Sequence, residues 1–577
     1  MTEQRSIPQL TLEDFDGRFA DRHLLHSVVE KWARERPHQA AIISADGGET
    51  LSWAEFDRLT RGLAMHLVEL GYRKGDRLLT VLPLLAGHII LEYACFRIGM
   101  IFIPLDLRLS PAEVIRCAQA LRPKGFALPG GENFRPLAEA VRRECGSVEH
   151  YIEFAAGGQA AEGNIAFNAM LARASELARE NGEPGSDPPA GAGLRAVYAL
   201  AAAGVAEDDG ALVIFTTGST GSPKPALLTH RGIACQAMCL SQAFFRGDSG
   251  MRTLVNLPPS HVGGQTELLM GTFFGGGTAV ILAAFDPLRP LRAIEQHRVQ
   301  VLGQIPAMFE FEWRLKEFDS FDLSSLEFVA YGGQQVSEAF LARMAKMAPW
   351  LGTGLGLSEA SGFCSYQLRP RERASELLAS LGADMPVYAA SVRDEMRPDG
   401  FAGDERPQGE IGHICFRGPQ SFREYLGDEQ ATARAISRDG FLYTGDLGFR
   451  DDDGLHLSGR AKWVIKPSGY QVFPADVENH FCALADRVAS CAVVGVAHAV
   501  VSEAIVAFVE KKPGAELSRP MLEKHARALA SYMRPRHYCL LEPGEMPLNR
   551  VAKPDYLRLQ QLALREVETL RAQGKWR

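Results

Sequence analysis

Residues 211–225 of the chain read ALVIFTTGSTGSPKP. The first five are apolar and typical of a buried strand, and a loop with two glycines and five hydroxyl residues follows. Backbone N–H groups and hydroxyls in such a loop can surround phosphate oxygens, and Lys224 adds a cation. It is not a Walker loop, because Pro223 separates the second glycine from Lys224 and Pro225 discourages the helix that a Walker loop opens. The stretch therefore predicts a site for a triphosphate.

The segments on either side of this loop alternate between helical and strand-like patterns. Residues 59–70 have helical periodicity, residues 77–84 are strand-like and apolar, and residues 89–96 continue the alternation. This alternation predicts an α/β fold with mixed or parallel sheets. Between residues 155 and 209 the composition shifts to Ala, Gly, Pro and Glu, which predicts a surface excursion with some helix.

The pattern changes again near Gly459, after a turn sequence at residues 451–454. Residues 489–496 and 505–510 are strand-like, and residues 519–533 predict a helix. We expect a separate C-terminal domain of about 115 residues, which is near the usual domain size.

Composition and charge exclude several functional classes. The chain has 577 residues, of which 46% are hydrophobic, so it can bury a large core and form more than one domain. The net charge is only -8 and the basic residues are spread out, which argues against nucleic acid as a partner. The ten cysteines form no CxxC pair, and Cys235 and Cys239 have no partners at zinc spacing, so we expect buried thiols in a reducing compartment.

No segment predicts a signal peptide or a membrane span. Residues 1–8 lack an apolar core, and the apolar run at 273–285 is too short to cross a bilayer. The apolar run from Ala492 is interrupted by His498 and Glu503. We expect a cytoplasmic protein.

Residues 215–224 closely resemble the signature loop of the adenylate-forming superfamily, which includes acyl-CoA ligases, peptide-synthetase adenylation domains and beetle luciferases. Further motifs follow in that family's order, from LSWAE at 51–55 and PLD at 104–106 to a lysine near the C-terminus. The resemblance covers nearly the whole chain, although Pro225 stands where family members usually have glycine.

The resemblance implies a fold of two domains. The large N-terminal domain, residues 1–461, would bind ATP and the carboxylate and contain mixed β-sheets with flanking helices, in five layers (αβαβα) plus a small barrel. The C-terminal domain, residues 462–577, would be a small, mobile α+β domain with its hinge at Lys462.

The resemblance also assigns nucleotide contacts. The residues that it places around the ATP phosphates are Thr216, Thr217, Gly218, Ser219, Thr220, Gly221 and Lys224. Gly332 and Gly333 would lie beside adenine, where glycine lets the backbone approach a flat base. The segment GLGLSE at 354–359 is similar to the family's aromatic-Gly-x-Thr-Glu motif, which places Gly356, Leu357 and Ser358 at the nucleotide and Glu359 at Mg2+. Leu355 replaces the aromatic residue, so only apolar contact with adenine remains.

The remaining motifs concern the ribose and the two chemical steps. Asp446 in YTGDL at 443–447 is the expected ribose anchor, because one carboxylate can accept from both hydroxyls, and Arg460 is a second contact. Lys553 ends PLNRVAK at 547–553, which resembles the family's terminal motif with the adenylation lysine. Lys466 and Gly469 lie in VIKPSGYQV at 464–472, which resembles the loop that reaches the thioester-forming pocket.

The stretch LPPSHVGG at 257–264 resembles the family segment with a histidine or aromatic residue at the mouth of the carboxylate pocket, which makes His261 a candidate. Peptide-synthetase domains usually have an Asp just after this residue, and its absence disfavours an amino acid substrate. The glycines of this and the later segment predict space for a fatty, alicyclic or aryl acid; they are Gly263, Gly264, Gly354 and Gly356.

We therefore expect an AMP-forming acid-thiol ligase that uses ATP and Mg2+. It would convert a carboxylic acid to acyl-AMP with release of pyrophosphate and then pass the acyl group to coenzyme A. Three alternatives stay open: transfer to the phosphopantetheine of an acyl carrier protein, luciferase-type oxygenation, and a nucleotide-binding relative without turnover. A relative without turnover would be consistent with three residues that differ from the family's motifs: Pro225, Leu355 and Ala552.

Overall fold

The apolar residues 211–215 form a strand, as the sequence predicts. Strand β8 (Gly210–Phe215) pairs antiparallel with β9 (Pro225–Thr229), so the glycine- and hydroxyl-rich loop connects two neighbouring strands. Pro225 pairs with Phe215 as the first residue of β9, which is a strand position that tolerates a residue without an N–H. The computed structural model describes residues 10–155, 157–180, 193–216, 223–498, 500–549 and 553–576.

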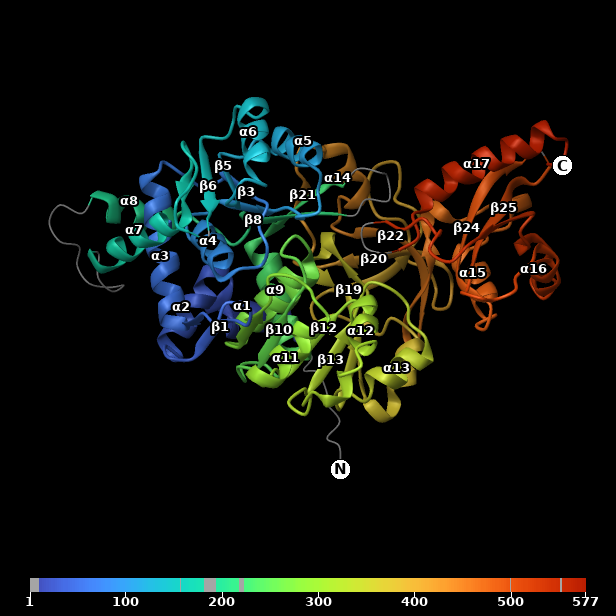
Figure 1. Cartoon of the computed structure of the whole chain (residues 1–577), viewed down its shortest axis with the longest axis horizontal. Helices are drawn as coiled ribbons and strands as arrows, with labels where there is room; N and C mark the ends of the chain where they lie inside the picture. Colours follow the sequence, from blue (N-terminus) through green and yellow to red (C-terminus); the bar gives the residue numbers. More distant parts are fainter. Residues whose placement is uncertain are drawn as a thin grey trace. The chain divides into compact units, whose positions relative to one another are not determined.

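The chain divides into two compact units, which are coloured along the sequence in Figure 1. Unit 1 comprises Met1–Thr217, Pro223–Ala390 and Phe416–Leu442. Unit 2 comprises Gly218–Ser222, Ser391–Cys415 and Tyr443–Arg577. The division of domains at residues 461 and 462, with a hinge at Lys462, stays a prediction.

Unit 1 contains two large mixed sheets. The first has nine strands in the order β18 (Ala383–Asp384), β17 (Ser365–Pro370), β14 (Trp350–Thr353), β13 (Phe328–Tyr331), β12 (Val301–Gln304), β10 (Arg252–Val255), β11 (Thr278–Ile281), β1 (Ala40–Ser44) and β2 (Thr50–Ser52). The second has eight strands in the order β21 (Glu424–Tyr425), β9, β8, β4 (Ile101–Pro104), β3 (Arg77–Thr80), β5 (Gly125–Pro129), β6 (His150–Phe154) and β7 (Ile165–Ala166). The predicted α/β class is confirmed.

Helices cover and separate these sheets. The helix α4 (Ala86–Phe96) is buried along its whole length and contacts strands of both sheets, as its apolar sequence on every face requires. The central strands are parallel pairs, which are normally covered on both faces. Other helices that flank the sheets are α3 (Trp53–Glu69), α5 (Pro111–Leu121), α6 (Arg135–Glu144), α9 (His230–Ala243), α11 (Leu288–His297), α12 (Pro306–Trp313) and α13 (Glu338–Met344).

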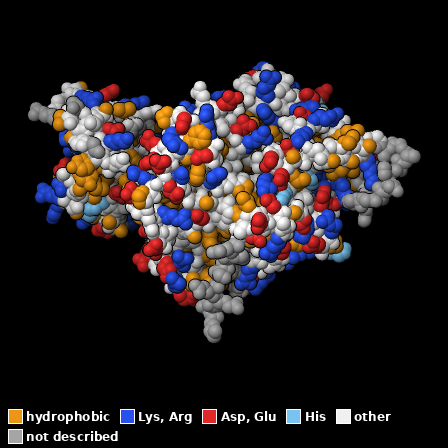
Figure 2. Space-filling model, turned by 180° about the vertical axis from the view of Figure 1, so that it is seen from behind, with side chains coloured by type: hydrophobic (Ala, Val, Ile, Leu, Met, Phe, Trp, Pro, Cys, Tyr) orange, Lys and Arg blue, Asp and Glu red, His pale blue; other side chains and the backbone are white. Residues whose placement is uncertain are grey.

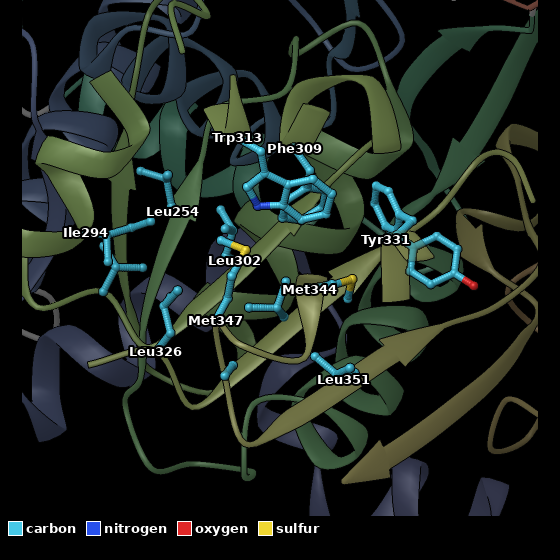
Figure 3. Packing of buried hydrophobic residues seen from close by; sticks show 14 of the residues in the cluster. Leu254, Ile294, Leu302, Phe309, Trp313, Leu326, Tyr331, Met344, Met347 and Leu351 are labelled. Carbon is cyan, nitrogen blue, oxygen red and sulfur yellow. The ribbon is translucent and has the colours of Figure 1, made fainter. Parts of the chain in front are cut away.

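Figure 3 shows the main core beside the nine-stranded sheet. Leu302 and Val329 on the strands are fully buried, and Phe309 and Trp313 of α12 pack in the same cluster with Met344 of α13. Because side chains of a strand alternate between faces, Leu302, Val329 and Tyr331 of this cluster lie on one face of β12 and β13.

Unit 2 ends in a three-stranded sheet, β24 (Val488–His498), β25 (Ser502–Lys511) and β26 (His537–Leu541). One face packs with α15 (Pro474–Cys482) and α16 (Arg519–Ala526), and the other with α17 (Tyr556–Ala572). The two strands predicted from residues 489–510 are confirmed. The helix predicted for 519–533 is wrong in length, because α16 ends at Ala526 and a short 3-10 turn occupies Ser531–Met533.

A four-stranded sheet is the next largest after the two large sheets among the described residues. Its order is β19 (Ala389–Arg393), β20 (Gly412–Arg417), β22 (Leu442–Asp451) and β23 (Gly454–Arg460). The hairpin of β22 and β23 turns at residues 451–454, as their sequence predicts. On the face shown in Figure 2, Lys and Arg side chains are interspersed with Asp and Glu. Among the described helices, none combines the length and apolarity that a membrane crossing requires.

Candidate functional site

In unit 1, Lys224 and Glu359 lie on either side of one tyrosine. Nζ of Lys224 is 4.9 Å from the ring centroid of Tyr425, and the Tyr425 hydroxyl donates a 2.6 Å hydrogen bond to Oε1 of Glu359. Burial and the adjacent Glu359 carboxylate raise the pKa of Tyr425, so the hydroxyl stays protonated and remains a donor. The structure thus brings together the cation of the phosphate loop and the predicted metal ligand. Of the loop itself, Thr216 is described and its N–H donates to the carbonyl of Lys224 at 2.9 Å, whereas Thr217, Gly218, Ser219, Thr220 and Gly221 lie outside the described residues.

The turn that carries Glu359 is held from two sides. It is a short 3-10 turn, Ser358–Ala360, followed by Ser361 at a φ of 58°, a left-handed conformation that is uncommon for serine. The Ser361 hydroxyl donates to the carbonyl of Gln420 at 3.0 Å, and its own carbonyl accepts from the Thr266 hydroxyl at 2.7 Å. These bonds fix the direction of the Glu359 side chain, which is partly exposed and has the oxygen chemistry that Mg2+ prefers.

The predicted adenine glycines lie just after β13. Gly333 has a φ of 90°, which glycine adopts without strain, and it is exposed. A Cβ at Gly332 would lie 3.5 Å from Cζ of Phe363, so an aromatic ring is adjacent to this turn. Leu357 follows Gly356 in the short strand β15 (Gly356–Leu357), which pairs with β16 (Gly362–Phe363). Sequence reasoning did not identify Phe363 as a neighbour of this turn.

His261 is exposed at the start of a helical segment. Its Nδ1 accepts from the N–H of Gly263 at 3.2 Å, so the neutral ring carries its proton on Nε2. The residues after it form a π-helix, Gly263–Met270, a rare form that is frequent at functional sites. A Cβ at Gly263 would lie 3.4 Å from Nδ1 of His261 and 3.6 Å from Oε2 of Glu267.

The four glycines that were expected to leave room for the acid have two different roles. A Cβ at Gly264 would lie 2.7 Å from the Leu257 carbonyl oxygen, and one at Gly354 would lie 2.0 Å from the Ser365 carbonyl oxygen. These two glycines permit close backbone packing, so the expectation of substrate space was wrong for them. Gly356 is exposed, and its Cβ would be 3.5 Å from Oε1 of Glu267. A Cβ at the buried Gly263 would lie 3.1 Å from Cδ1 of Leu257, so the exposed Gly356 is the one of the four that adjoins open space.

Unit 2 contains the second group of candidates. Asp446 and Arg460 face each other across the β22–β23 hairpin, with Nε of Arg460 2.8 Å from Oδ1 of Asp446. The Asp446 side chain is 3% exposed and its backbone N–H donates to the Thr444 hydroxyl at 3.1 Å. A buried carboxylate with one arginine partner on a rigid hairpin is suited to holding polar hydroxyls in a fixed position.

Lys553 belongs to the same electrostatic environment. Burial lowers its pKa, Arg460 lowers it further, and Asp446 raises it. Its backbone is held by Asn549, whose N–H donates to the Lys553 carbonyl at 2.7 Å. In unit 2, Asp446 and Arg460 thus form an ion pair, and both act electrostatically on Lys553.

The predicted hinge and thiol-step residues follow Arg460 closely in the sequence. Nζ of Lys462 is 4.3 Å from the Trp463 ring, and burial together with Arg460 lowers its pKa. Lys466 is exposed, and its backbone N–H donates to a Glu503 carboxylate oxygen at 2.5 Å. Gly469 ends the 3-10 turn Pro467–Gly469, and the N–H of Ser468 in this turn donates to the carbonyl of Val501 at 2.7 Å, just before β25.

Comparisons with known proteins identify the family of the chain. Residues 29–426 match the model of the AMP-binding enzyme family, and residues 476–553 match the AMP-binding enzyme C-terminal domain. The chain belongs to the AMP-binding enzyme family. Its identity with the feruloyl-CoA synthase of an Amycolatopsis species is 30% over 466 residues, which is 80% of this chain and 84% of the relative.

Further relatives agree in length and fold. The indoleacetate–CoA ligase of Aromatoleum aromaticum is 28% identical over 552 residues, which cover 93% of this chain and 98% of the ligase. The structure of ATP-bound MatB from Rhodopseudomonas palustris superimposes with a TM-score of 0.74 at 22% identity, covering 94% of this chain and 99% of MatB. The chain is thus an AMP-forming enzyme of the acid–CoA ligase class, and its fold is that of the adenylate-forming superfamily.

Besides Phe363, two further residues of the site escaped the sequence analysis. Tyr425 has the pattern of any buried aromatic, and nothing in the sequence links it to Glu359, 66 positions earlier. Glu267 had a signal, because it is the only charged residue in the stretch VGGQTELLMGTFF at 262–274. A lone carboxylate in an apolar run indicates a specific role.

Proposed function

We propose that this enzyme joins an aryl carboxylic acid to coenzyme A in two steps. In the first, a carboxylate oxygen of the acid attacks the α-phosphorus of ATP, the bond to the β-phosphate oxygen breaks, and pyrophosphate leaves. In the second, the thiolate of coenzyme A attacks the acyl carbon and AMP leaves with the bonding electron pair. The names of the relatives support an aryl acid, since they act on feruloyl and indoleacetyl groups.

The observation that carries the first step is the position of Lys553 beside Asp446 and Arg460. A carboxylate and an α-phosphate repel each other, and a cation placed between them orients the pair and stabilises the charge that develops. With Asp446 accepting from the ribose hydroxyls, Lys553 and Arg460 would lie near the phosphate that is attached to this ribose. Partial burial of Lys553 strengthens its interaction with that phosphate.

Lys224 and Glu359 would serve the phosphates that leave. Lys224 contributes a cation to the loop, and Glu359 fits a magnesium ligand because it is partly exposed and held by the Tyr425 hydroxyl. The metal would supply positive charge to the pyrophosphate oxygens. In the second step Lys466 and Gly469 would lie on the path of the coenzyme A arm, with rotation of the C-terminal domain about Lys462.

Pyrophosphate exchange across a panel of aryl, alicyclic and fatty acids tests the first step. We expect ATP–pyrophosphate exchange that depends on Mg2+ and on an aryl acid. Failure of every acid to support exchange would contradict the proposal. The second step is tested by adding coenzyme A or a phosphopantetheinylated carrier protein to the enzyme with ATP and the best acid. If a thioester forms only on the carrier protein, then the carrier protein, and not coenzyme A, is the acyl acceptor.

A further inference from the structure

Backbone hydrogen bonds connect Lys553 and the residues after it to residues 547–549. The N–H of Asn549 donates to the Lys553 carbonyl at 2.7 Å, and the N–H of Asp555 donates to the Pro547 carbonyl at 2.8 Å. Helix α17 begins directly after Asp555, which is its N-cap. The position of Lys553 within unit 2 therefore depends on how the first turn of α17 is held.

Tyr556, the first residue of α17, is attached to α15 through its hydroxyl group. The hydroxyl donates a 2.7 Å hydrogen bond to Oε1 of Glu478, and the same oxygen accepts from the N–H of Val493 on β24 at 2.8 Å. Burial and the adjacent Glu478 carboxyl raise the pKa of Tyr556, so the hydroxyl stays protonated and remains a donor. One carboxyl oxygen thus connects the start of α17 to a helix and a strand of the C-terminal sheet.

The ring of Tyr556 makes a second contact, with the segment that follows Arg460. The ring centroids of Tyr556 and Trp463 are 5.3 Å apart. Trp463 lies three residues after Arg460, and Tyr556 lies three residues after Lys553. The two rings therefore join the chain segments that carry the two cations. This contact accounts for the electrostatic effect of Arg460 on Lys553, although the two residues are far apart in the sequence.

We propose that Tyr556 is a positioning residue for adenylation, which holds Lys553 in place through the hydrogen bond to Glu478 and the contact with Trp463. The inference rests on the proposed ligase function, in which Lys553 acts in the first step. Loss of the Tyr556 hydroxyl should therefore slow acyl-AMP formation and leave the attack of coenzyme A on preformed acyl-AMP unchanged.

A purely structural role for Tyr556 has a different consequence. Lys466 and Gly469, which we assign to the second step, belong to the same unit as Tyr556. General loosening of this unit would slow both steps, whereas a shift of Lys553 alone would slow only the first. The ratio of the two rates therefore separates positioning from structural support.

The test measures the two half-reactions separately. Acyl-AMP formation is followed in a single turnover with the aryl acid that gives the fastest pyrophosphate exchange. Thioester formation is followed with coenzyme A and the chemically synthesised acyl-AMP of the same acid. Tyr556→Phe keeps the ring beside Trp463 and removes the hydroxyl. We expect the first rate to fall about 10-fold and the second to stay within about 2-fold of wild type, since a misplacement of about 1 Å can cost about 10²-fold.

The partner carboxyl provides an independent set of variants. Glu478→Gln keeps an oxygen that can accept from Tyr556 and should retain the rate of acyl-AMP formation, whereas Glu478→Leu should lower it as Tyr556→Phe does. The double variant of Tyr556→Phe and Glu478→Leu should be no slower than the slower single variant, because both changes remove the same hydrogen bond. Tyr538→Phe is the matched control, since it removes the hydroxyl of another buried tyrosine in the same unit, and it should leave both rates unchanged.

Equal slowing of both half-reactions in Tyr556→Phe would overturn the inference, as would an unchanged rate of acyl-AMP formation or additive losses in the double variant. Melting curves show whether each variant is folded, and a shared loss of active protein does not alter the ratio of the two rates. Wild-type enzyme that forms no acyl-AMP with any acid of the panel would instead overturn the ligase function, and with it this inference.

Discussion

At the scale of single residues, the chemistry of adenylation depends on Lys553. Its pKa responds to Asp446 and Arg460, which lie on a hairpin roughly a hundred residues earlier in the chain, so its electrostatic surroundings depend on the fold of unit 2 as a whole. Lys462 and Lys466 have different surroundings, with an aromatic ring beside one and solvent around the other.

Lys553→Ala should slow acyl-AMP formation by roughly 10² to 10³, because it removes one preorganised cation from the transition state. Single-turnover formation of acyl-AMP measures this step directly. Lys524→Ala is the control, since Lys524 is an exposed lysine of α16 in the same unit. A Lys553→Ala enzyme with the rate of this control would show that Lys553 does not act in adenylation.

Tyr425 offers a second test, since it contacts both Lys224 and Glu359. Tyr425→Phe keeps the ring beside Lys224 and removes the hydroxyl that donates to Glu359. We expect the apparent affinity for Mg2+ to fall by about 10-fold, since hydrogen-bond partners of metal ligands typically contribute 10- to 100-fold. Titration of activity with Mg2+ at saturating ATP measures the change, and an unchanged half-saturation point would exclude a positioning role for Tyr425.

At the scale of elements, neighbouring glycines in one segment have opposite roles. Gly354 lies where the chain passes close to the backbone of β17, whereas Gly356 begins β15 and faces the Glu267 carboxyl. Both glycines fit the sequence motif at 354–359 equally well. The sequence shows that neither residue has a side chain, but it does not show which neighbouring atoms a side chain would meet.

Gly354→Ala should therefore lower the free energy of unfolding by about 1–3 kcal/mol or more, because the new Cβ overlaps the Ser365 carbonyl oxygen. Gly356→Ala should keep the melting temperature near that of wild type and raise KM for the acid. Thermal melting and acid titrations of the two variants provide the comparison. Equal loss of stability in both would contradict the assignment of Gly356 to the site.

At the scale of the whole molecule, the sequence indicated the fold better than the site. The alternation of helices and strands predicted the α/β class, and the turn at residues 451–454 correctly placed the hairpin that carries Asp446 and Arg460. The long-range contacts could not be predicted from the sequence. The hydrogen bond between Tyr425 and Glu359, for example, forms because β21 is the edge strand of the eight-stranded sheet. The polarity of Glu267 was visible, but its neighbours Gly263 and Gly356 come together only in the fold.

The buried titratable groups of unit 1 also give the molecule a characteristic dependence of stability on pH. Glu92 and Glu312 have pKa values near 8 in the folded protein, against 4.5 for an ordinary glutamate. The folded state then binds more protons than the unfolded state between these values, so the free energy of unfolding falls as pH rises and levels off above about 8. Buried His88 and His230, with pKa values lowered to about 3 and 4, act in the opposite sense, but only below the ordinary histidine pKa of 6.5.

Between pH 6.5 and 8, the pH dependence of the unfolding free energy therefore comes from the buried carboxyls and not from His88 or His230. There each buried glutamate should contribute a loss of up to about 1.4 kcal/mol of unfolding free energy per pH unit. Denaturant unfolding at several pH values should show a falling stability in wild type and a shallower slope in Glu312→Gln, which cannot ionise. An equal slope in both would mean that Glu312 is already ionised in the folded protein, and that the amide of Gln304 binds a carboxylate.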